Sequence, residues 1–132
     1  MARSTPFLGV FGRFGRSESL RTLDKVLRAV DLHPNLVPEA VKLTVVSLLM
    51  DAYAEDPREP DYRHAAELIG YVALGADGFT VANGEAAAND AERRIEAALA
   101  DEDSLDAKLI LLALHSSIVH PALKEAWQLE SD

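Results

Sequence analysis

The spacing of apolar residues along this chain is typical of α-helices. From Ser17 onward, apolar side chains recur every three or four residues, which places them on one face of a helix. Serine is a favoured N-terminal cap, and a residue that precedes proline avoids helical backbone angles. We therefore predict a first helix that begins at Ser17 and ends at His33-Pro34.

Two later segments are apolar around nearly their whole circumference. One spans about residues 38–54 and begins at Pro38, a residue type that is common in the first helical turn. The other spans about residues 104–119 and begins at Ser104. Because a helix that is apolar on all sides must be buried, we expect these two helices to pack together at the centre of the fold.

The remaining segments predict smaller helices around this central pair. Helical patterns run over residues 61–75, 85–100 and 122–129, and residues 77–84 are expected to form a connector with a short extended piece. No strand pattern of any length is present. The sequence therefore predicts an all-α, single-domain bundle of five to six helices with two central, nearly fully apolar ones.

The first 16 residues differ from the rest, so we divide the chain into an N-terminal arm (1–16) and a helical domain (17–132). The arm holds three of the four phenylalanines, interleaved with glycine and arginine. Burying one phenylalanine side chain is worth roughly 1.5–3 kcal/mol. We therefore expect the phenylalanines of the arm to be buried against another surface. The arm can fold over its own body or a twin subunit, or dock on another protein, a membrane surface or RNA. The candidate interaction residues are Phe7, Phe11, Arg13, Phe14 and Arg16.

Charge separates the same two segments. The chain carries −9, and the arm has three arginines and no acidic residue, so residues 17–132 carry −12. An acidic body repels phosphate backbones, which argues against nucleic-acid binding by the domain. No run of 18 apolar residues exists, so we expect no transmembrane segment, and without an export signal we expect a cytoplasmic protein.

Residues that could carry chemistry are few. The absence of cysteine excludes thiol nucleophiles, disulfides and cysteine-ligated zinc. His115, which we expect among buried positions near the end of the helix at 104–119, fits either a core histidine or a catalytic base for Ser116. Adjacent helical residues point about 100° apart, so these two cannot form a catalytic pair by themselves. We predict no enzymatic activity, no metal and no cofactor.

The tripeptide Ala76-Asp77-Gly78 follows an apolar helix and precedes an acidic one. In this respect it resembles the Ala-Asp-Gly loop of the tellurite-resistance TerB-like helical family, over about 30 residues. The segment here is several residues longer than that loop and carries Phe79 and Val81 where acidic residues are expected. The resemblance implies that Asp77 and Glu85 are candidate cation contacts.

Together these features predict a non-enzymatic helical module that acts by protein–protein contact. Its partner is either a second copy, which would make a homo-oligomer, or another protein. The uncovered aromatic arm and the strongly apolar helices favour this interpretation. The alternative is a helical domain that binds a small ligand or a divalent cation, near His115 or between Asp77 and Glu85.

Overall fold

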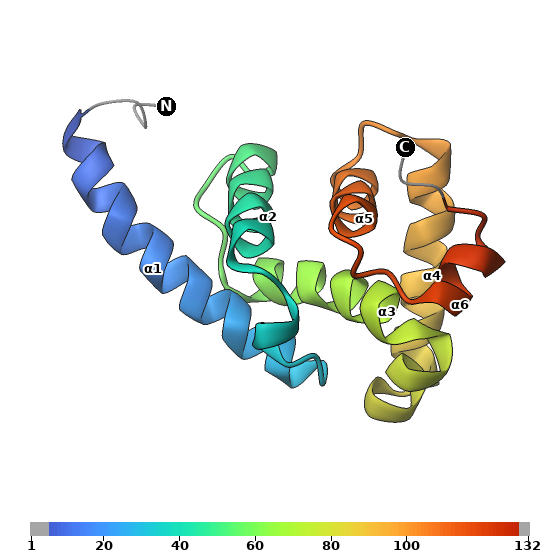
Figure 1. Cartoon of the computed structure of the whole chain (residues 1–132). Coiled ribbons are helices and arrows are strands. Elements are labelled where there is room, and N and C mark those ends of the chain that lie inside the picture. Colours follow the sequence, from blue (N-terminus) through green and yellow to red (C-terminus); the bar gives the residue numbers. More distant parts are fainter. Residues whose placement is uncertain (1–5, 130–132) are drawn as a thin grey trace.

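The computed structural model describes the backbone of residues 6–129 and the side chains of residues 18–129 (Figure 1). Within this range the predicted all-α fold is confirmed, with six α-helices and one short 3₁₀ turn. The elements are α1 (Pro6–Ala29), η1 (Pro34–Leu36), α2 (Glu39–Ala52), α3 (Glu59–Asn83), α4 (Glu85–Ala100), α5 (Leu105–His115) and α6 (Pro121–Ala126).

Helix α3 is the centre of the bundle, because the other five α-helices all pack against it. In Figure 1 it runs beneath α2 and α5, with α1 at one end and α4 and α6 at the other. Helices α2 and α5 do pack against each other, as expected, but α3 was expected at the periphery. Its buried residues are Tyr62, Ala65, Ala66, Leu68, Ile69, Gly70, Tyr71, Val72, Gly75 and Phe79.

Small residues allow this central position. A Cβ atom at position 70 would lie 2.9 Å from Cγ2 of Val30, so glycine is what lets α1 approach α3 so closely. Ala65 and Ala66, one turn earlier, are also fully buried. Because its neighbours can approach it so closely, α3 lies at the centre of the core although it carries both polar and apolar residues.

By length and composition, α3 is also the one helix within the described range that could cross a membrane. Half of its most apolar stretch is buried against the other helices, and a core helix passes the same test. The absence of a transmembrane segment therefore stays a prediction.

Helix α3 bends at Gly75, whose backbone angles (φ 84°, ψ 165°) are open to glycine and strained for other residues. The chain then resumes a helix to Asn83, so the prediction of a partly extended connector at 77–84 is wrong. The reason is Phe79, which is fully buried and makes an edge-to-face contact with Tyr71 at 5.4 Å between ring centres. A helical turn is what carries this side chain into the core.

Helix C-termini are closed by turns that the sequence did not reveal. Asp31, Ser117 and Gln128 each have positive φ, and each lies in a Schellman arrangement. After α5, for example, the Ile118 N–H donates to the Ala113 carbonyl and the Ser117 N–H to the Leu114 carbonyl, both at 3.1 Å. These turns end α1 before His33 and α5 before residue 119, which corrects both predicted ends.

Replacing Ser117 by glycine is expected to raise the free energy of unfolding by about 0.5–1 kcal/mol, measured by urea denaturation. At φ 59° glycine has no Cβ clash, and its greater freedom in the unfolded chain offsets part of the gain. Ser116→Gly is the matched control, because Ser116 has ordinary angles (φ −96°, ψ 2°) and should lose stability. If Ser117→Gly is the less stable of the two, the proposed strain at this turn is absent.

Helix α1 begins at Pro6, well before the predicted start at Ser17. The backbone of residues 6–16 is therefore the first part of α1, and Figure 1 shows it extending past α2 and away from the bundle. Proline is favoured in a first helical turn, which fits this start. The predicted interaction residues Phe7, Phe11, Arg13, Phe14 and Arg16 lie on this segment, and their side chains are outside the described ones.

Candidate functional site

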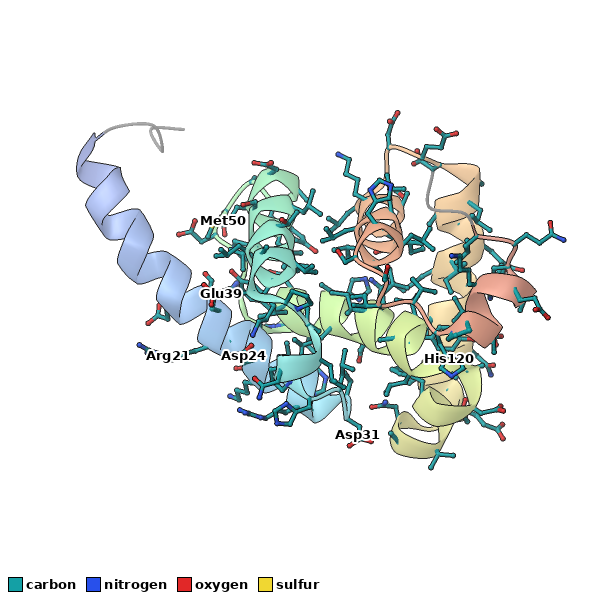
Figure 2. All side chains as sticks on the ribbon, in the orientation of Figure 1. Arg21, Asp24, Asp31, Glu39, Met50 and His120 are labelled. Carbon is teal, nitrogen blue, oxygen red and sulfur yellow. The ribbon has the colours of Figure 1, made fainter. Side chains whose placement is uncertain are left out.

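An open pocket of about 340 Å³ lies where the part of α3 beyond its bend meets α6. Figure 2 shows His120 between these two helices. The lining comes from two segments that are far apart in the sequence. It consists of Leu74, Gly75, Ala76, Asp77, Gly78, His120, Ala122, Leu123, Ala126 and Trp127.

His120 joins the two sides of the pocket. Its backbone N–H donates to the Val72 carbonyl at 2.7 Å, and its Nδ1 accepts from the Ala122 N–H at 3.1 Å, which caps α6. Its ring lies directly against Gly75, where an added Cβ would come within 3.0 Å of the imidazole Cγ. The imidazole is therefore fixed in place by α6 and by the bend of α3.

The lining is apolar with one anionic group. Leu123 is buried, and Leu74 and Trp127 are half-buried. Asp77, in the first turn after the bend, is exposed and makes no hydrogen bond or ion pair with the described residues. Glycine and alanine supply much of the rest of the wall. No other acidic side chain among the described lining residues therefore competes with Asp77 for a cationic group.

The structure separates the residues that the sequence singled out. His115 is exposed rather than buried, because α5 ends there and its buried positions are Leu109, Ile110, Ala113 and Leu114. It is not part of the pocket lining. Asp77 lines the pocket, whereas Glu85 lies in the first turn of α4 and does not.

The described residues contain no group of three or more histidine and carboxylate side chains arranged to hold a metal ion. The Ala76-Asp77-Gly78 segment, which resembles a TerB-like loop, is the first turn of the helix after the bend. A lone carboxylate at a helix start is a poor divalent-cation site, since such ions need several oxygen ligands.

Sequence reasoning missed His120 and Trp127 as site residues. Both could have been noticed: His120 precedes a proline that begins a helix, and Trp127 is the single tryptophan of the chain. Neither signal says that α6 folds back onto α3, which is what brings them together.

Two tyrosines have shifted acidity, and both lie outside the pocket lining. Burial, followed by a hydrogen bond to Glu92, raises the pKa of Tyr71 to about 12. Its hydroxyl donates to Glu92 Oε2 at 3.0 Å and so ties α3 to α4. Burial, together with the nearby Asp61 carboxylate, also raises the pKa of Tyr53. Both phenols stay protonated near neutral pH.

The fold and the pocket define a small helical-bundle protein with an apolar, singly acidic surface depression. The chain matches no protein-family model, no curated protein and no solved structure.

Proposed function

We propose that this protein is a non-enzymatic helical interaction module that self-associates through the N-terminal part of α1. The observation that carries the proposal is the register of α1. Among its described side chains, one face is buried and the opposite face is exposed. The buried face holds Leu23, Val26 and Leu27, and the exposed face holds Glu18, Arg21 and Lys25.

Positions 7, 11 and 14 continue the exposed face toward the N-terminus. The steps from position 7 through 11, 14, 18 and 21 to 25 alternate between four and three residues, the spacing of one helix face. By this spacing, the positions of the three phenylalanines share one helix face with Glu18, Arg21 and Lys25, which are exposed. This register argues against the alternative that the arm covers itself on its own body.

A second copy of the chain is the partner that fits this stripe. The alternating spacing is the one that helices use to pair, and a stripe that pairs with itself forms a two-fold contact. Arg13 and Arg16 fall on the other side of the helix, so a symmetrical pairing of residues 7–14 does not bring these arginines together at its seam. Burying several phenylalanines supplies the association free energy.

The test compares the full chain with a variant carrying Phe7→Gln, Phe11→Gln and Phe14→Gln, by native mass spectrometry and light scattering. We expect a dimer for the unchanged chain and a dissociation constant raised more than about 100-fold in the variant, because three aromatic anchors are lost. The matched control, Arg13→Gln with Arg16→Gln, changes the other face and should stay dimeric. A monomeric unchanged chain, or a variant that still pairs, overturns the proposal.

A small-ligand-binding function is the second candidate, and the pocket between α3 and α6 favours it. The same pocket disfavours the divalent-cation form of this candidate, because Asp77 is the one carboxylate that the structure describes in its lining.

A further inference from the structure

We infer that the pocket beside the bend of α3 binds a small organic cation, an amine or guanidinium that carries an apolar body. This site is distinct from the self-association surface proposed above, because the described residues that line it come from α3 and from residues 120–127. The inference rests on the shape of the pocket and on the chemistry of three side chains, Asp77, His120 and Trp127.

The size and lining of the pocket suit a compact organic molecule. Ligand pockets usually hold about 300–1,000 Å³, and this one, at about 340 Å³, has room for one ring with a short chain. Leu74, Leu123 and Trp127 offer apolar surface. Gly78 leaves free space at the pocket wall, since an added Cβ there would meet only Leu74 within 4 Å, whereas the space beside Gly75 is filled by the His120 ring.

The charge of the pocket selects a cation. Asp77 is the one formally charged group among the described lining residues, and it has no ion-pair partner in the described part of the chain. Trp127 adds the aromatic ring that binds cations best through its π face. The −12 charge of residues 17–132 draws cations toward the domain and repels anions.

His120 has a structural role in this site, and Asp77 is the residue that contacts the cation. The Nδ1 atom of His120 accepts a hydrogen bond from the Ala122 N–H, and the imidazole ring is held against Gly75. The pocket wall is therefore formed before a ligand arrives. An anion would meet the Asp77 carboxylate, and a bare divalent ion would find too few oxygen ligands among apolar neighbours.

Trp127 makes the experiment direct, because it is the only tryptophan of the chain and it lines the pocket. Its fluorescence in the full-length protein is followed during titration with 2-phenylethylamine, 2-phenylethanol and phenylacetate, which share a ring and differ in charge. We expect saturable changes with millimolar affinity for the amine, about threefold weaker binding of the alcohol, and the weakest binding of the carboxylate. Free N-acetyltryptophanamide reports any collisional quenching.

Two variants separate a real site from a nonspecific signal. Asp77→Asn should remove the preference for the amine over the alcohol, whereas the matched control Glu85→Gln, at an exposed acid outside the pocket, should keep it. Gly78→Leu should abolish binding of both, since a Cβ there meets only Leu74, at 3.6 Å, and the longer side chain fills the pocket. The inference is overturned if the unchanged protein shows no saturation, if amine and alcohol bind equally, or if Asp77→Asn keeps the preference.

Discussion

Phe79→Ala is expected to lower the free energy of unfolding by about 3–4 kcal/mol, measured by guanidinium denaturation. The ring is fully buried, packs edge-to-face on Tyr71, and lies near Gly70, where an added Cβ would be 3.4 Å from its Cε1. Truncation removes this apolar contact and leaves a cavity that neighbours on α1 and α3 cannot fill. The loss would show that the helical turn after the bend is a core element.

Val81→Ala is the matched control, because Val81 lies two residues further along the same helical segment and is 88% exposed. Its replacement should change stability by less than about 0.5 kcal/mol. Phe79→Leu should fall between the two, since leucine keeps much of the buried volume. Equal effects of Phe79→Ala and Val81→Ala would mean that this segment is not docked on the core.

The second large effect concerns Arg94, which joins three helices. Its guanidinium donates two hydrogen bonds to the Asp106 carboxylate, at 2.9 and 2.8 Å, and a third to the His64 carbonyl at 2.7 Å. The two side chains are only 14% and 20% exposed. Arg94→Ala is expected to lower the free energy of unfolding by about 2–3 kcal/mol, because it leaves the mostly buried Asp106 carboxylate without its guanidinium partner.

Arg93→Ala provides the comparison for this prediction. Arg93 also pairs with a carboxylate, that of Asp90, but both side chains are mostly exposed, so we expect a change below about 0.5 kcal/mol. The double variant Arg94→Met with Asp106→Leu should recover much of the stability lost in Arg94→Ala, because it removes both charges. Thermal and chemical denaturation that find Arg93 and Arg94 equivalent would contradict this account.

The sequence was informative wherever a local rule decides the structure. Helix α4 spans Glu85–Ala100 as predicted, and α5 begins after Ser104, whose hydroxyl accepts from the Ala107 N–H at 3.1 Å. Both follow from apolar spacing and from a good capping residue, which act within a few neighbouring residues.

The sequence was least informative where contacts between residues far apart along the chain determine the local structure. The helical pattern was expected to end at residue 75 and to be followed by a connector, yet only Gly75 departs from helical angles, and Gly78 lies within the helix that follows. Buried contacts of Phe79 select this outcome. The ends of α1 and α5 were placed too late because Asp31 and Ser117 occupy turn positions where glycine is the usual signal.

The candidate site was predictable only in part. Asp77 was singled out and does line the pocket, but His115 and Glu85 do not. The pocket exists because α6 packs back on α3 and sets His120 against Gly75, and no local pattern encodes that contact. The residues of the N-terminal arm remain a prediction that the association experiment addresses.

The central position of α3 also bears on how the chain folds as it is synthesised. Helices α1 and α2 emerge from the ribosome before α3 and α5, but α1 packs most extensively on α3, and α2 packs on α5 as well as on α1. Until these later helices have been synthesised, the apolar faces of α1 and α2 have only each other to contact. Growing chains of this protein therefore pass through a stage with uncovered apolar surface, the stage at which chaperones bind nascent proteins.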